Sequence, residues 1–269
     1  MKTHVIVAVS IAVMAVLISY AMFLGGIGPV PVRTQLRTLA HHYVLWTYNP
    51  FKKIFSALAP EGVTSIVWDY RGLDTYFETA VMFLAIISVV SLTHGCKVKI
   101  GLGKGGMSAI VKTTTRVVLP LIVLAGVSIT MHGWLTPGGG FQGGSTIAVA
   151  TVIALVTYSV DELARRGIRK RVLLAMRSGG LLGIVASAIA LIVVGAAIGV
   201  NAYIFQNQVR IGSPLHFPSY FLGTPLGGSL LFFNLFEAFA VSAGLSLAII
   251  VTSLREAEVK PTLRGEGVE

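Results

Sequence analysis

The chain has 269 residues, of which 54% are hydrophobic and only 12% are charged, and its mean hydropathy is +0.81. Such a composition excludes an ordinary soluble globular domain. The formal net charge of +10 arises from 21 basic and 11 acidic residues. In a soluble protein this excess would suit nucleic acid. In so apolar a chain it indicates orientation in the lipid bilayer and contact with anionic lipid, so no nucleic-acid partner is predicted.

Six apolar stretches are long enough to cross a bilayer, which takes about 20 residues of helix. They are residues 5–24, 76–94, 117–135, 141–160, 178–200 and 229–252. The sequence therefore predicts an all-α integral membrane protein with about six transmembrane helices. The first stretch follows Lys2, as in a signal peptide, whereas its length favours a retained anchor. Both interpretations stay open.

The basic residues predict how the chain crosses the membrane. No Lys or Arg falls inside the six stretches; loops 95–116 and 161–177 are rich in them, and loop 201–228 holds only Arg210. Because basic loops stay in the cytoplasm, we predict a multi-pass protein of the cell membrane with cytoplasmic N and C termini. Segment 25–75 then faces outward. Its aromatic and basic part, 33–58, fits either an element lying on the membrane surface or a solvated loop.

Soluble-type chemistry finds no support in the sequence. The single cysteine, Cys96, excludes an intrachain disulfide and a cysteine-ligated iron–sulfur cluster. The six histidines are scattered, and the neighbours His41 and His42 would diverge by about 100° on a helix. The glycine-rich run 101–106 lacks the spacing of a phosphate-binding loop and fits a flexible basic turn. We predict no metal site, no cofactor and no catalytic centre in this chain.

The most informative segment is residues 132–144, which read His-Gly-Trp-Leu-Thr-Pro-Gly-Gly-Gly-Phe-Gln-Gly-Gly. Pro137 ends the preceding helix, and the glycines leave backbone N–H and C=O groups without covering side chains. In a bilayer such backbone is tolerated only where protein buries it or water wets it. The segment is therefore predicted to be either a tight buried hairpin or part of an ion path.

Two acidic residues, Glu78 and Glu237, fall inside the apolar stretches. A charge at the centre of a bilayer costs at least about 2.5–3.5 kcal/mol on insertion scales, so such residues often mark ion pathways. Asn234 lies one helical turn before Glu237, so both side chains are expected on one face. Glu237 fits an ion relay or a protonated glutamate that bonds a neighbouring helix. Glu78 fits an ion relay or a helix cap.

The fifth stretch carries a ridge of small residues. Gly179, Gly183 and Ser187 recur every four residues, as do Gly195 and Gly199. Such a ridge predicts the close approach of another helix, within this chain or from a partner subunit.

Two motifs resemble a known family. Residues 132–144, with Gly223-Thr-Pro, Gly227-Gly228 and Asn234-Leu-Phe-Glu237, resemble the B-subunit domain of Mrp-type Na⁺/H⁺ antiporters. Asp69-Tyr-Arg-Gly-Leu-Asp-Thr-Tyr-Phe-Glu78 resembles the end of the large antiporter A subunit, a piece that also occurs as a small E-type subunit of archaeal membrane-bound hydrogenases and their sulfur-reducing relatives.

The resemblance implies a domain organisation. It consists of an E-like segment with two transmembrane helices at 1–96, a basic glycine-rich linker at 97–107, a B-like domain with four transmembrane helices at 108–255 and a cytoplasmic tail at 256–269.

The resemblance also implies a function, namely a subunit of a membrane complex that exchanges Na⁺ for H⁺, with other membrane subunits as partners. Glu78 matches an acidic residue implicated in ion passage, and Pro137 and Phe141 match loop positions linked to antiport. Together with Asp74, His132, Asn234 and Glu237 they form the candidate ion-translocation residues.

One position departs from the family pattern, because Trp134 stands where many members have a second histidine. His132 is then the only imidazole of the loop, and a proton role at position 134 is in doubt. Since the large A-subunit body is absent, a hydrogenase-like respiratory complex is favoured over a free antiporter. The competing hypothesis is a non-conducting scaffold that docks larger antiporter-like or redox subunits.

Overall fold

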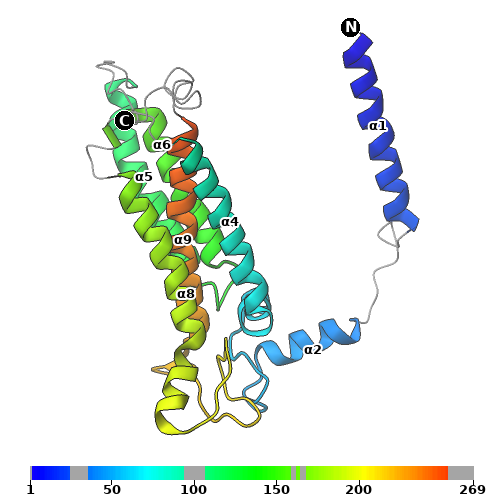
Figure 1. Ribbon diagram of the computed structural model, residues 1–269, viewed down its shortest axis with the longest axis vertical. Coiled ribbons are helices and arrows are strands. Elements are labelled where there is room, and N and C mark those ends of the chain that lie inside the picture. The colour runs from blue at the N-terminus through cyan, green and yellow to red at the C-terminus, as the bar shows by residue number, and fades with distance from the viewer. Residues whose placement is uncertain (1, 25–35, 94–106, 159–161, 164–167, 254–269) are drawn as a thin grey trace. The chain divides into compact units, whose positions relative to one another are not determined.

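The structure is a computed structural model that describes residues 2–24, 36–93, 107–158, 162–163 and 168–253 (Figure 1). These residues belong to two compact units, 1–42 and 43–269. Among them, six helices are long and apolar enough to span a membrane, which confirms the predicted all-α membrane fold. The predicted linker at 97–107, except its last residue, and the predicted tail at 256–269 lie outside the described residues.

The first unit contains α1 (Lys2–Met22) and the start of α2 (Thr38–Thr47). Helix α1 is apolar around its whole circumference, and every side chain described for it, from Val5 on, is exposed within the chain. A helix that is hydrophobic all round belongs in lipid or against a protein partner. This matches the first predicted span, at 5–24.

The second unit is a bundle of five long helices: α4 (Gly72–Leu92), α5 (Ala109–Met131), α6 (Gly140–Tyr158), α8 (Lys170–Ile198) and α9 (Ser229–Thr252). Helix α9 packs against each of the other four and is the most buried of them (Figure 1). Its buried positions are mostly small or apolar, for example Ala240, Ala243 and Gly244. Small residues allow helix backbones to approach closely where lipid supplies no hydrophobic drive.

Three helices begin at least four residues earlier than the sequence predicts. Helix α4 begins at Gly72 instead of residue 76, α5 at Ala109 instead of residue 117 and α8 at Lys170 instead of residue 178. Hydropathy marks the apolar length of a helix, whereas the backbone continues its hydrogen bonding into polar sequence. The assignment of five basic residues to loops is therefore wrong, because they lie inside α5 or α8: Lys112, Arg116, Lys170, Arg171 and Arg177. Of these only Arg177 is buried.

Short elements close one end of the bundle, here called the loop end and made of residues 43–71, 132–139 and 199–228. They include α3 (Gly62–Thr64), the π-helix η2 (Ser65–Tyr70) and the antiparallel strands β1 (Tyr220–Phe221) and β2 (Thr224–Pro225). Asn207 donates from Nδ2 to the carbonyl of Ala57 at 2.9 Å, and Thr64 donates from Oγ1 to the carbonyl of Gly133 at 2.6 Å. Side chains thus join segments that lie far apart in the sequence.

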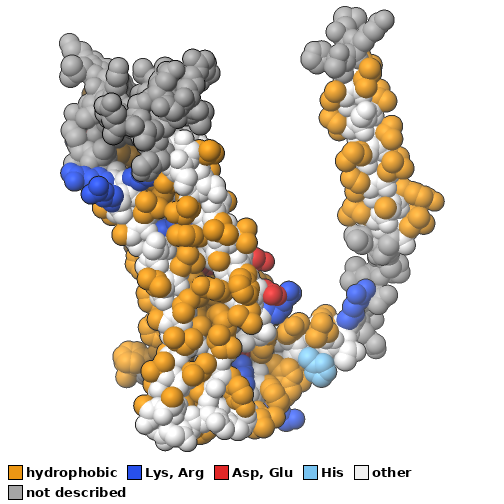
Figure 2. Space-filling model, in the orientation of Figure 1, with side chains coloured by type: hydrophobic (Ala, Val, Ile, Leu, Met, Phe, Trp, Pro, Cys, Tyr) orange, Lys and Arg blue, Asp and Glu red, His pale blue; other side chains and the backbone are white. Residues whose placement is uncertain are grey.

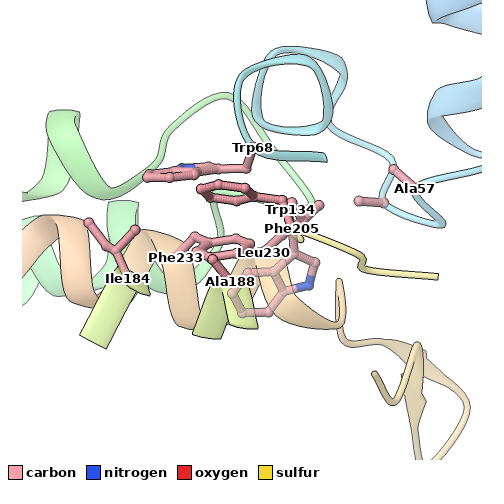
Figure 3. Packing of buried hydrophobic residues seen from close by; sticks show 9 residues of the cluster. Ala57, Trp68, Trp134, Ile184, Ala188, Phe205, Leu230 and Phe233 are labelled. Carbon is pink, nitrogen blue, oxygen red and sulfur yellow. The ribbon is translucent and has the colours of Figure 1, made fainter. Parts of the chain in front are cut away.

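An aromatic cluster fastens η2 to α9 (Figure 3). The ring of Trp68 stacks on Phe233 with centroids 4.8 Å apart and an interplanar angle of 13°, and Phe205 lies beside both. Aromatic pairs of this kind contribute about 0.5–1.5 kcal/mol beyond the area they bury. The cluster fixes the position of Trp68, whose indole N–H is near the side chain of Glu237.

Candidate ion-translocation site

The glycine-rich segment forms the turn between α5 and α6, in contact with α9. A Cβ built on Gly133 would lie 2.7 Å from Nδ2 of Asn234, and one on Gly144 would lie 2.9 Å from the carbonyl oxygen of Ala238. Gly139 has a φ of +139°, which favours glycine. The glycines are therefore needed for close packing, which is the geometry of the tight buried hairpin. A role of their backbone in ion passage stays a prediction.

The turn lies on the face of α9 that carries Asn234 and Glu237. Both side chains are buried, with 1% and 6% of their surface exposed. A Cβ built on Gly140 would meet the backbone oxygen of Asn234 and would lie 2.6 Å from Oε2 of Glu237. The structure thus brings together two residues predicted to share a face and packs the first residue of α6 against them.

The Glu237 carboxylate lies at the start of α6. The backbone N–H of Phe141 and the indole N–H of Trp68 are within hydrogen-bonding reach of it. The N-terminus of a helix favours negative charge, because its first N–H groups have no partner within the helix. This placement suits a structural anchor for α6. It also suits an ion relay, since the same donors would hold a carboxylate from which a proton has left.

One buried donor near Glu237 has no partner in the described part of the chain. Nδ2 of Asn234 is inaccessible to solvent and makes no hydrogen bond to any residue the structure describes. Leaving such a group unpaired costs about 1–3 kcal/mol. Buried polar groups of this kind are where proteins hold internal water.

The other acidic candidates lie on an open face of α4. Asp74, in the first turn, accepts a hydrogen bond from Nε of Arg71 at 2.6 Å, and Glu78 lies one turn further along. A shallow groove of about 610 Å³ runs along this face, and its lining residues are Arg71, Asp74, Phe77, Glu78, Val81, Met82 and Ala85. Figure 2 shows the acidic side chains exposed on this flank. Glu78 lies beyond the first turn, so the helix-cap interpretation fits Asp74 better.

The exposed and the buried carboxylate lie on neighbouring helices. Helix α4, which carries Glu78, packs against α9, which carries Glu237, and the two carboxylates repel each other weakly. The site therefore combines one acidic group open to the chain's surroundings with one enclosed by the bundle.

Three other candidates do not join this pair through their side chains. His132, Pro137 and Phe141 are exposed on the surface of the chain, and Phe141 approaches Glu237 only through its backbone. Nδ1 of His132 lies 2.9 Å from the carbonyl oxygen of Ser128, within its own helix turn.

Trp134 has a structural role in this chain. Its indole N–H donates to the carbonyl of Pro225 at 3.1 Å. Its side chain also fills the space beside Gly227, where a Cβ would lie 2.6 Å from the indole ring. The Trp134 side chain thus holds the glycine turn to residues 225–227.

The sequence interpretation missed two buried charges. Arg210 donates to both carboxylate oxygens of Asp69 at 2.7 Å, and no surface of the Asp69 side chain is exposed. Burial raises the pKa of Asp69 to about 6, although Arg210 opposes this shift. A signal was present, because Arg210 is the only basic residue of its loop. The second charge, Arg177, gave no signal because hydropathy placed it outside a span.

Comparison with known proteins places this chain in a family. Residues 110–247, just over half of the chain, match the model of the domain related to the MnhB subunit of Na⁺/H⁺ antiporter. An uncharacterised protein of Methanocaldococcus jannaschii is 29% identical over a match that covers 39% of this chain and 47% of that protein. The match thus spans about half the length of that relative.

Two solved structures share the fold. A chain of the membrane-bound sulfane sulfur reductase, an archaeal respiratory membrane complex, superposes with a TM-score of 0.68 at 26% identity and covers 92% of this chain and 98% of that one. A chain of the Mrp complex from a Dietzia species gives a TM-score of 0.65 at 20% identity. The match covers 93% of this chain and 26% of that one. The predicted resemblance is confirmed. This multi-pass membrane protein belongs to the family of domains related to the MnhB subunit of Na⁺/H⁺ antiporters.

Proposed function

We propose that this chain is a membrane subunit of an Mrp-type cation/proton antiporter module, within a hydrogenase-like or sulfur-reducing respiratory complex. In this proposal it contributes part of the path on which Na⁺ is exchanged for H⁺. The observation that carries the proposal is the pair formed by Glu78, exposed in a groove, and Glu237, buried on the next helix. The family membership and the two structural neighbours support it.

The pair supplies the coupling that exchange requires. Two nearby carboxylates repel each other, so a cation or proton bound at Glu78 changes the affinity of Glu237 for its own proton. By thermodynamic linkage the converse holds with the same coupling free energy. The groove along α4 is where ions would enter from a neighbouring subunit, and Asn234 would hold water beside Glu237.

A second candidate function is a scaffold that conducts no ions. It is favoured by the donors around Glu237, which hold the start of α6 regardless of any ion flow. In this alternative the exposed face of α4 and the apolar surface of α1 only dock other subunits.

The deciding experiment measures Na⁺-dependent proton exchange by the intact complex in proteoliposomes. Glu78→Gln and Glu237→Gln should each abolish exchange while the subunits still co-purify, because glutamine keeps the shape and loses the ionisable group. Glu258→Gln, the same change in the predicted tail, should leave exchange intact. Normal exchange in both test variants would exclude the proposal and leave the scaffold.

The proposed orientation has its own test. In a Cys96→Ser background, Leu222→Cys at the exposed tip of the β1–β2 turn should react with an impermeant maleimide from outside the cell. Ser253→Cys, exposed just beyond the other end of α9, should react only after permeabilisation. Reversed accessibility would place both termini outside.

A further inference from the structure

A buried arginine lies inside the bundle with two guanidinium nitrogens that have no hydrogen-bond partner among the described residues. Arg177, the eighth residue of α8, has 1% of its surface exposed. Its Nε and Nη1 atoms are inaccessible to solvent and make no hydrogen bond to any residue within the described ranges. A charge inside a membrane protein is costly, so its presence is by default a sign of function.

The guanidinium lies between three helices. Its Cζ atom is 4.8 Å from the ring centre of Phe83 on α4, and a Cβ built on Gly244 of α9 would collide with Nη1 and lie 3.1 Å from Cζ. Arg177 lies eight residues into α8, and Gly244 lies eight residues before the end of α9, so the charge is about two helical turns inside one end of the bundle. The cation–π contact with Phe83 offsets part of the cost of burial, but it uses none of the N–H donors.

Arg177 and Glu237 lie along the same seam of α9. Gly244 lies seven residues after Glu237, or about two helical turns, so the two residues are on the same face of α9. Gly244 is about 10 Å further along the helix axis. Between them Gly180 of α8 packs on Ala240 of α9, where a Cβ on the glycine would lie 2.7 Å from the Ala240 nitrogen. The carboxylate and the guanidinium are too far apart to pair, and small residues separate them.

We propose that Arg177 is an electrostatic barrier that closes this seam to cations, so that ions at Glu237 exchange only through the side of Glu78. The unpaired N–H groups bind water, as buried polar groups do, and the fixed positive charge repels Na⁺ and hydronium in that water. Arginine excludes protons and cations from other membrane pores in this way. Because arginine is effectively always protonated, the barrier is permanent. This inference rests on the proposed function.

The test compares leaks through the purified complex in proteoliposomes. Arg177→Met removes the charge at similar length, Arg177→Lys keeps it, and Arg171→Met removes an exposed arginine of the same helix. Two rates are measured, the decay of a pH gradient without Na⁺ and the uptake of radioactive Na⁺ without a pH gradient. Arg177→Met should raise both leaks about tenfold, the size expected for a unit charge acting over about 10 Å near protein. The two other variants should stay tight.

Unchanged leaks in Arg177→Met would overturn the barrier. If that variant fails to assemble, hydroxyl-radical footprinting of the wild-type complex decides, because a hydrated seam labels Phe83 and a dry one does not. An unlabelled Phe83 overturns the inference. The two proposals fail separately. Loss of exchange in Glu237→Gln with no leak in Arg177→Met removes only the barrier, whereas normal exchange in Glu78→Gln and Glu237→Gln removes the proposed function itself.

Discussion

The two acidic positions of this protein lie in opposite surroundings. Glu237 is enclosed by the glycine turn, the start of α6 and the indole of Trp68, so its polar contacts come from within the chain. Glu78 is exposed on α4 in a groove whose other lining residues are mainly apolar. A charge facing lipid costs at least about 2.5–3.5 kcal/mol. The Glu237 carboxylate is therefore surrounded by groups of its own chain, whereas a charged Glu78 would need a neighbouring subunit or a bound ion.

The enclosed site is most directly broken at a glycine. Gly144→Val would place a branched side chain against the backbone of α9, where a single Cβ already lies 2.9 Å from the carbonyl oxygen of Ala238. Because helix backbone cannot move aside cheaply, we expect no folded complex. The measurement is the monodisperse peak on size exclusion after detergent extraction. Gly179→Ala is the control, since nothing lies within 4 Å of its Cβ. A normal Gly144→Val peak would refute the packing argument.

A second contrast lies between a buried and an exposed ion pair. Arg210→Met would leave Asp69 unpaired where none of its surface is exposed, and breaking such a buried pair costs about 3–5 kcal/mol. Arg71→Met, which removes the exposed partner of Asp74, should cost less than about 1 kcal/mol. Thermal unfolding at pH 7.5 compares the two. Equal losses of stability in the two variants would mean that the Arg210–Asp69 ion pair does not stabilise the loop end.

The same pair predicts a pH dependence. The pKa of Asp69 is raised from its ordinary 3.8 to about 6, because burial outweighs the attraction of Arg210. Its contribution to stability is thus fully present below pH 3.8 and is lost as the pH rises through about 6, by at most about 3 kcal/mol. The midpoint temperature of thermal unfolding should decrease as the pH is raised from 4.5 to 7.5. The Asp69→Asn variant should show a weaker dependence of this temperature on pH. An equally steep slope in the variant would assign it to other groups.

The smallest effect is expected at Trp134. Trp134→Phe removes the hydrogen bond to the Pro225 carbonyl but keeps a ring beside Gly227, so the loss should be about 1 kcal/mol. Exchange by the complex should be unaffected, because the indole N–H of Trp134 donates to the backbone of Pro225. Loss of exchange at full stability would show that position 134 takes part in transport.

The sequence predicted the helices well because membrane spans are a property of local composition. The six apolar stretches all correspond to helices. The one-turn spacing of Asn234 and Glu237 also predicted their common face, since the helical period fixes it. Glycine spacing was a poorer guide. Gly183 does pack against the ring of Phe236, but Gly179 has no neighbour, and its adjacent residue Gly180 makes the close contact with α9.

Sequence by itself thus determined which segments cross the membrane and which acidic residues enter it, because both follow from hydropathy and helical period. The tertiary structure alone decided that Glu237 is enclosed, that Glu78 is open and that Arg177 is buried between α4, α8 and α9. Burial and pairing depend on which helices lie side by side. That is set by packing between residues far apart in the chain, for example Gly140 on Glu237 and Gly244 on Arg177.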